Sequence, residues 1–516
     1  MKILTRILTL LLSAALLAAA LCGCGGGKPV ASQTADPTGT AGQPEAKSEL
    51  TIGISQDLDD SLDPHKMTAA GTREVLFNVF EGLVKPDTEG NLIPAVAESY
   101  VIADTGDTFT FKLREGVRFH NGGTVTVGDV VYSISRAAGL ETGEPLIAAF
   151  AAVESVEAAD DEAVVIKTKE PYLEFLSYLT AAIIPEGSSP ADGLVGTGPY
   201  KFVSRAAQEN VVLERFADYW GEPASIEKVT FKVIENADML VMSLKSGAID
   251  LCAHLTASQA NELGDGFTVL EGSTNVVQAM YLNNAYGPLQ DVRVRQALCY
   301  GVDRQGILDL VADGKGSILG SSMYPAFGKY YEDLTGLYPY DVEKAKSLLA
   351  DAGYADGFAL EITVPGNYQF HVDTAQALAE QLRAIGVQCT IKNVEWSSWL
   401  ETVYQNREYQ ATVVGFDTSA AMTAQSLLAR FESTSRKNVC NFASEDYDKT
   451  YAAAIAETDE ARQIALYKQL ETILAEEAAA VYIQDPCDLV AVRAGVTGYR
   501  FYPIYVMDLS SLKIEG

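Results

Sequence analysis

Basic residues are scarce in this chain of 516 residues, because 38 lysines and arginines stand against 69 aspartates and glutamates and the formal net charge is -31. A surface this acidic repels phosphate backbones, so we expect no nucleic acid partner. The acidity is explained by solubility alone. Hydrophobic residues make up 48% of the sequence, which predicts a sizeable core and a globular protein.

Motifs that carry catalysis or hold a metal are also missing. The sequence has no G-x-x-x-x-G-K-[ST] phosphate loop, no G-x-S-x-G nucleophile elbow and no H-E-x-x-H zinc motif. Only four histidines occur, and no two of them have metal-ligand spacing. We therefore expect no catalytic residue, no metal and no cofactor.

Seven cysteines are too few and too scattered for a disulfide scaffold. Two belong to the N-terminal segment, and the other five include no C-x-x-C pair: Cys252, Cys299, Cys389, Cys440 and Cys487. We expect most of these five to be buried as small hydrophobic residues, and one disulfide stays open as an alternative.

No hydrophobic run reaches the about 20 residues that a membrane span needs. The longest run follows Lys2 and Arg6 and ends in small residues, which predicts a signal peptide over residues 1–23. Residues 21–24, Leu-Cys-Gly-Cys, resemble a bacterial lipobox, which implies a lipid on Cys24 and cleavage just before it. An ordinary secreted protein is the alternative.

Residues 24–48 are rich in Gly, Pro, Ser, Thr and Ala, so they are predicted to form a flexible tether behind the lipidated Cys24. The expected location is the outer face of the bacterial cytoplasmic membrane, or the periplasm of a cell with two membranes. Ordered structure should begin at the alternating stretch "LTIGIS" from Leu50.

Strand-like and helix-like patterns then alternate, which predicts an α/β fold. Asp303 and Asp341 are placed as helix N-caps. Helices are predicted at residues 129–138, 171–179, 444–457 and 458–479.

Several of these segments form a recognisable series. The series includes LFNVFEGLVKPDTEGNLIPAVAESY (76–100), FTFKLREGVRFHNGGTVTVGDVVYSISRA (109–137), GTGPYKF (196–202), DYWG (218–221), LKSGAIDL (244–251), LNNAYGPLQDVRVRQALCYGVDR (282–304) and YDVEKAKSLLADAGYADGF (340–358). In content and order they resemble the family 5 extracellular solute-binding proteins, the peptide, nickel and opine receptors of ATP-driven importers.

This resemblance implies a periplasmic-binding-protein-like fold of type II, with two lobes and a hinge between them. Within type II it implies the cluster of large proteins that have an extra sub-domain. Ligand would bind in the cleft between the lobes, and hinge closure would present the closed form to a membrane permease. The implied division places lobe I at residues 49–78, 205–275 and 487–516, its inserted sub-domain at 79–204 and lobe II at 276–486.

The stretch "ATVVGFDTSAA" at residues 411–421 is the first candidate site. By resemblance, peptide receptors end a strand here with Gly-Trp and then use an aspartate to pair with the α-ammonium of the ligand. Taking Phe416 for the tryptophan places that aspartate at Ser419. Asp417 lies two residues earlier on the same face, and replaces the lost carboxylate only if the path of the loop shifts.

A second departure concerns the ligand carboxylate. Dipeptide receptors use an arginine at the position that Tyr368 occupies, and residues 364–374 contain no Arg or Lys. His371, in the same loop, is a candidate ligand contact. Trp396 and Trp399 share one helical face, and either pack in the core or line the cleft.

Both charged clamps for a free dipeptide are thus missing, which favours longer peptides held through their backbone. A nickel chelate or another small organic solute is the next alternative. A signalling receptor on the same fold is a further one, whereas an enzyme with Asp417 as nucleophile lacks a paired base. We expect a monomer whose partners are the ligand, permease subunits and, through Cys24, the membrane.

Overall fold

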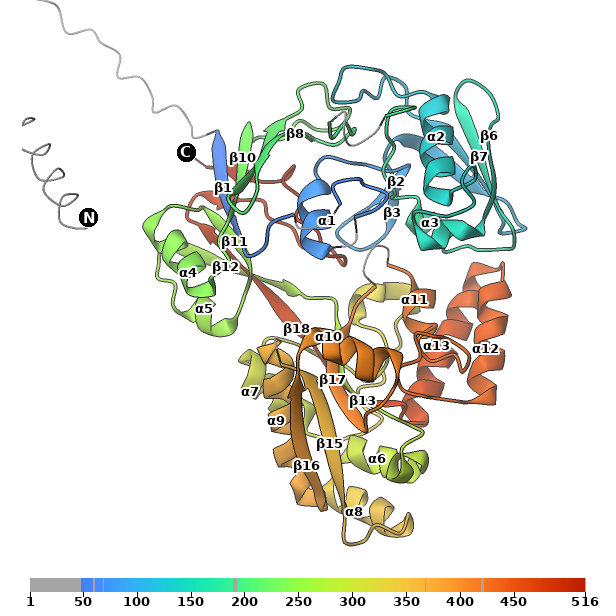
Figure 1. The fold of residues 1–516 in the computed structure, drawn as a ribbon, viewed down its shortest axis with the longest axis vertical. Helices are drawn as coiled ribbons and strands as arrows, with labels where there is room; N and C mark the ends of the chain where they lie inside the picture. Colours follow the sequence, from blue (N-terminus) through green and yellow to red (C-terminus); the bar gives the residue numbers. More distant parts are fainter. Residues whose placement is uncertain are drawn as a thin grey trace, which may run out of the picture. The chain divides into compact units, whose positions relative to one another are not determined.

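The computed structural model describes residues 48–58, 61–67, 69–188, 193–366, 368–418 and 422–515. The predicted signal peptide, Cys24, nearly all of the tether and Ser419 lie outside these ranges. Within them, strands and helices alternate along the chain as predicted for an α/β protein (Figure 1).

Among the described residues, the largest sheet has twelve strands. Its order is β16-β15-β17-β13-β18-β11-β1-β10-β9-β8, and β12 and β14 pair with β18 beside this path. The strands are β1 Glu49–Ile54, β8 Tyr200–Ala206, β9 Asn210–Arg215, β10 Lys228–Val233, β11 Leu251–Leu255, β12 Phe267–Ser273, β13 Val277–Leu282, β14 Gly316–Ile318, β15 Phe358–Pro365, β16 Val387–Val394, β17 Ala411–Phe416 and β18 Ala480–Arg493.

The long strand β18 links the two ends of this sheet. Its first residues pair with β13, where Ala480 lies opposite Tyr281, and its last residues pair with β12, where Arg493 lies opposite Phe267. Figure 1 shows β18 running between the two groups of strands. The first part of the strand buries Val481 and Ile483, and the last part buries Val490 and Val492, which is typical of a strand covered on both faces.

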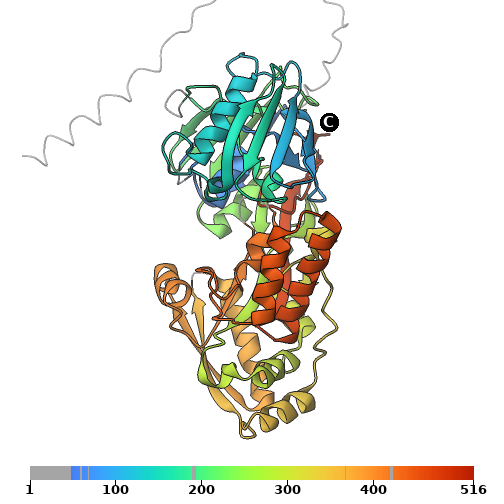
Figure 2. The ribbon, with the colours of Figure 1, turned by 90° about the vertical axis from the view of Figure 1, so that its right-hand side faces the viewer.

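A second sheet of the described residues has the order β4-β5-β7-β6, and α2 packs across β6 and β7 (Figure 2). The smaller strands are β2 Val84–Pro86, β3 Leu92–Pro94, β4 Ala97–Ile102, β5 Thr108–Leu113, β6 Val153–Ala158, β7 Ala163–Thr168, β19 Val496–Thr497 and β20 Lys513–Ile514. The helices are α1 Ala70–Leu76, α2 Val127–Ala138, α3 Phe175–Tyr178, α4 Ala237–Ser246, α5 Ala257–Asn261, α6 Val292–Tyr300, α7 Arg304–Ala312, α8 Val342–Asp351, α9 Gln369–Leu382, α10 Trp396–Trp399, α11 Ala424–Leu428, α12 Glu445–Ala456 and α13 Glu460–Glu476.

The helix starts follow the local sequence closely. Asp303 accepts a hydrogen bond from the Gly306 amide at 3.0 Å, and Asp341 accepts one from the Lys344 amide at 2.9 Å, so both predicted N-caps are confirmed. The prediction of a helix over residues 171–179 is wrong, because only α3 is helical there. The Tyr172 amide donates to the Gly106 carbonyl instead of entering a helix.

The buried hydrophobic residues fall into separate cores. Two cores, with Trp399 and Leu378 among their members, draw only on residues between 277 and 483. The other three draw on residues up to 260 and from 489 onward. The division into lobes with the boundaries given above stays a prediction.

Candidate ligand-binding site

Four predicted site residues lie together where parallel strands end. Tyr368 and His371 follow β15, and Trp396 and Trp399 follow β16, which pairs in parallel with β15. The ring of Tyr368 is 5.4 Å from that of Trp396 and 5.7 Å from that of His371, and the two tryptophans stack at 5.1 Å. We call these four residues the aromatic cluster.

The two tryptophans have different roles in this cluster. Trp399 is 1% exposed, and its indole N–H donates to Thr412 Oγ1 at 2.9 Å, so it is a core residue. Trp396 is 37% exposed and Tyr368 is 45% exposed, so these two rings supply the accessible surface of the cluster. Core packing therefore accounts for Trp399, and only Trp396 stays a candidate for the cleft wall.

Both ring nitrogens of His371 lie close to a nitrogen atom of the chain, and the neutral ring accepts a hydrogen bond through one of them. Nδ1 lies 2.8 Å from Gln278 Nε2, and the Gly415 amide nitrogen lies 3.3 Å from Nε2. Burial lowers the pKa of His371 to about 4, so the ring is neutral at neutral pH. This arrangement fixes the end of β17 against α9.

Phe416 is the last residue of β17, and Asp417 follows it. Phe416 packs 4.8 Å from the ring of Tyr281, and Asp417 is half-buried. Thr418, buried beside them, has its Oγ1 3.5 Å from the hydroxyl of Tyr324. The strand therefore ends in a packed corner.

A cavity of about 750 Å³ lies elsewhere in the structure, and none of the predicted site residues lines it. Its walls come from α1, β2 and three later segments around residues 146–148, 178–182 and 500–510. The apolar lining includes Met67, Leu76, Phe77, Phe80, Val84, Ile93, Leu146, Ile147, Tyr178, Ile504 and Val506. Sequence reasoning missed this cavity, since only the fold brings these segments together.

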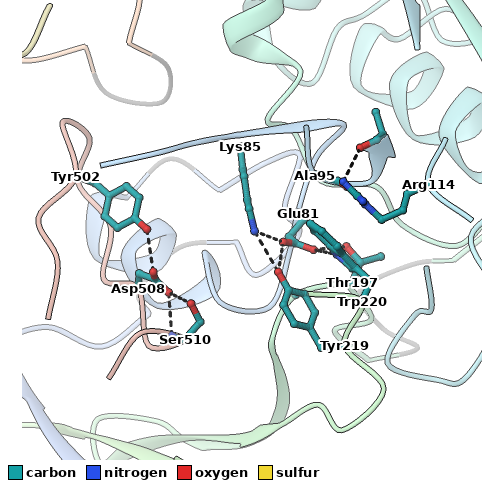
Figure 3. A network of polar contacts seen from close by, with 12 residues as sticks. Glu81, Lys85, Ala95, Arg114, Thr197, Tyr219, Trp220, Tyr502, Asp508 and Ser510 are labelled. Atoms are coloured by element: carbon teal, nitrogen blue, oxygen red, sulfur yellow. Dashed lines mark hydrogen bonds and ion pairs between the residues drawn. The ribbon is translucent and has the colours of Figure 1, made fainter. Parts of the chain in front are cut away.

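A buried carboxylate organises one wall of the cavity (Figure 3). Glu81 accepts hydrogen bonds from the Tyr219 hydroxyl at 2.7 Å, from Trp220 Nε1 at 2.8 Å and from Lys85 Nζ at 3.2 Å. Burial and the neighbouring Glu81 raise the pKa of Tyr219, so its hydroxyl stays a donor. The network holds Lys85 at the cavity surface.

A second carboxylate orders the opposite wall. Asp508 accepts from the Tyr502 hydroxyl at 2.8 Å, and from the amide and hydroxyl of Ser510 at 2.9 and 2.6 Å (Figure 3). Tyr502, Asp508 and Ser510 all line the cavity. Both walls are therefore fixed by hydrogen bonds within the protein.

The cavity and the end of β17 are neighbours. A Cβ atom built on Gly90 would lie 2.5 Å from Met422 Cε and 3.0 Å from Pro503 Cγ. The side chains of Met422 and Pro503 therefore both lie close to Gly90. Met422 follows Asp417 by five residues, while Asp87, Thr88 and Tyr502 line the cavity next to Gly90 and Pro503. Met422 thus lies near the rim of the cavity.

A separate buried carboxylate, which directly precedes α3, joins this helix to α11 and α13. Glu174 accepts from the amides of Ala424 at 2.7 Å and Gln425 at 3.0 Å, and from the Tyr467 hydroxyl at 2.9 Å. Burial raises the pKa of Glu174 to about 7. These contacts connect chain segments that are 250 or more residues apart.

The described part of the chain offers little for a metal or a disulfide. Within it, no group of three or more His, Cys, Asp or Glu could hold a metal ion. The five cysteines predicted to be hydrophobic are free thiols, and Cys252, Cys299 and Cys440 are buried. A search of the same residues finds no helix with the length and apolarity of a membrane span.

A cavity with largely apolar walls and a few ordered polar groups is typical of a site that binds a solute. The profile of the bacterial extracellular solute-binding proteins, family 5 (middle), matches residues 91–438. The chain belongs to this family. The predicted resemblance is confirmed, and because the family is one of binding proteins the chain is not an enzyme.

Individual proteins agree with the family match. The chain is 26% identical to the oligopeptide-binding protein AppA of Bacillus subtilis, over 94% of either chain. It is 25% identical to the glutathione-binding protein GsiB of Pectobacterium atrosepticum, over 86% of this chain and 90% of that one. The substrate-binding protein CtaP of Listeria monocytogenes has 23% identity and a TM-score of 0.84, over 92% of this chain and 100% of that one, which confirms the predicted fold.

Proposed function

We propose that the protein is a receptor, lipid-anchored through Cys24, that binds an oligopeptide in a cleft between two lobes. It would hand the peptide to the permease subunits of an ATP-driven importer. The relatives named for oligopeptide and glutathione binding support a peptide ligand. In this proposal the lobes have the predicted boundaries, and hinge closure signals that ligand is bound.

The cavity is the observation that carries the proposal. Its volume of about 750 Å³ falls in the range of about 300–1,000 Å³ that is usual for ligand sites. Apolar walls accept varied side chains, while backbone groups of an extended peptide find polar partners at the rim. The exposed rings of Tyr368 and Trp396, together with Asp417, would complete the site from the other lobe.

The charges at the cavity suit a ligand that carries a carboxylate. Its cationic side chains are those of Lys66, Arg73, Lys85 and Arg500, and its carboxylates are those of Glu81, Asp87 and Asp508. All three carboxylates already accept hydrogen bonds from the chain. Arg500 would therefore supply positive charge that the loop around Tyr368 lacks.

A matched pair of alanines tests whether the cavity binds the ligand. Ala148 and Ala151 are both exposed on one short 3₁₀ helix, Ala148–Ala152, but only Ala148 lines the cavity. Ala148→Trp should weaken binding of pentaalanine at least about tenfold, which corresponds to about 1.4 kcal/mol. Ala151→Trp should leave it unchanged. Equal affinities in a calorimetric titration of the two variants would exclude the cavity.

The alternatives make different predictions in the same titration. A receptor for a nickel chelate or another small organic solute would bind that solute and ignore pentaalanine. A signalling receptor would bind peptide, but a sensor kinase gene rather than a permease gene would lie beside its own gene.

A further inference from the structure

Arg430 follows α11 and has an unusual environment for a charged side chain. Its guanidinium carbon lies 4.2 Å from the centre of the Phe416 ring. Its Nε and Nη1 atoms are buried, and among the described residues neither finds a hydrogen-bond acceptor. A buried donor without an acceptor destabilises the fold, and it does so more strongly when it is charged. A guanidinium in this state is therefore expected to have an acceptor that the described residues do not supply.

Other cations lie on the same side of β17. Burial and the positive charge of Arg430 both lower the pKa of Lys437, so the two charges are close. Arg407 donates to Asn441 Oδ1 and to the Ser435 carbonyl, both at 3.1 Å, while its Nε is buried and finds no acceptor within the described ranges. Three cationic side chains thus converge on one region of lobe II.

The carboxylates of this region are engaged elsewhere. Glu432 accepts from the Thr434 hydroxyl at 2.8 Å, and Asp448 accepts from the Ser433 amide at 3.0 Å. Among the ion pairs of the described residues, none involves Arg407, Arg430 or Lys437. In a chain with a net charge of -31, this concentration of unneutralised cations needs an explanation.

We propose that Arg430, stacked on Phe416 with Lys437 beside it, is an oxyanion-binding site that takes a carboxylate or a phosphate-like group. The guanidinium offers charged N–H donors to such a group, and stacking on the Phe416 ring fixes its orientation. The oxyanion has two candidate sources. It is either the carboxylate of the ligand that the proposed function assigns to the cleft, or a free inorganic anion.

The test uses the full chain, at constant ionic strength, with three probes: sodium phosphate, trialanine and trialaninamide. Arg430→Gln should weaken phosphate binding about tenfold to a hundredfold, since a hydrogen bond to a charged group is lost. Lys437→Gln, an exposed change that leaves the fold intact, should weaken it about twofold to fivefold. Arg436→Gln, at an exposed arginine of the same segment, is the matched control and should change nothing.

The peptide probes separate the two sources. If the ligand supplies the carboxylate, trialanine binds more tightly than trialaninamide and Arg430→Gln removes this preference. If a free anion occupies the site, the phosphate effect depends on Arg430 and the two peptides bind alike. Failure of both peptides to bind would count against the proposed function only, because the phosphate titration still decides this proposal.

Stability measurements exclude a purely structural role. Arg430→Met removes the buried donors, so the variant should unfold at an equal or higher temperature than wild type while losing the phosphate-dependent shift. A phosphate titration unchanged in Arg430→Gln, or a variant Arg430→Met that is less stable but still responds to phosphate, would overturn the proposal.

Discussion

Raising the pH from about 5 to 8 should loosen the contact of α3 with α11 and α13, because Glu174 must then ionise in a buried position. Burial raises the pKa of Glu174 from 4.5 to about 7. A pKa raised in the packed state means that the contact is fully stable below about pH 4.5 and loses stability as the pH rises through 7. At 1.36 kcal/mol for each pH unit between these values, ionisation costs about 3 kcal/mol.

Hydrogen exchange of the Ala424 and Gln425 amides measures this contact directly, because both donate to Glu174. After correction for the intrinsic exchange rate, their protection should fall from pH 5 to pH 8 in the wild type. In the Glu174→Gln variant the two backbone amides should exchange faster than in the wild type at low pH, since the side-chain NH₂ group replaces one acceptor oxygen. Their protection should not depend on pH. Glu170→Gln, at an exposed carboxylate four residues earlier, is the control.

The reasoning is refuted if protection of these two amides stays constant between pH 5 and 8. It is equally refuted if Glu174→Gln keeps the pH dependence of the wild type, because the titrating group would then lie elsewhere.

Three further predictions concern single side chains. Trp399→Ala should lower the free energy of unfolding by about 3–5 kcal/mol in a denaturant titration, whereas Trp396→Ala at the exposed ring should cost much less. Burial raises the pKa of Glu471 to about 8, so ionisation of this carboxyl destabilises the fold between pH 5 and 9. Glu471→Gln should therefore flatten the dependence of stability on pH in that window. A pH profile of stability equal to that of the wild type would contradict this. Asp417→Ala should weaken pentaalanine binding about tenfold if this carboxylate pairs with the peptide ammonium, and equal affinity would remove Asp417 from the site.

The features that could be predicted from the sequence are those that depend on residues close together along the chain. The N-caps at Asp303 and Asp341 are local patterns, and so are the boundaries of α12 and α13, which differ from the prediction by a few residues. The segment 171–179 has a helical pattern too, but Tyr172 bonds to Gly106 and Glu174 bonds across to α11. Local hydrophobic periodicity does not predict contacts between residues that are so far apart in the sequence.

The site was predicted only in part, for the same reason. Tyr368, His371, Trp396 and Trp399 come together because they follow parallel strands, whose ends share one edge of the sheet. The cavity, by contrast, is built from segments between residues 64 and 510 that carry no common motif. Arg430 was not singled out from the sequence, because its contact with Phe416 depends on how the fold brings the two side chains together.

Native mass spectrometry of the mature protein, purified from its own cells without added ligand, tests the central claim most directly. The proposed function predicts a series of bound masses that fragment into peptides of several lengths, and predicts that Ala148→Trp loses the series while Ala151→Trp keeps it. A single bound mass of a metal chelate or another non-peptide solute would contradict the claim that this receptor binds oligopeptides.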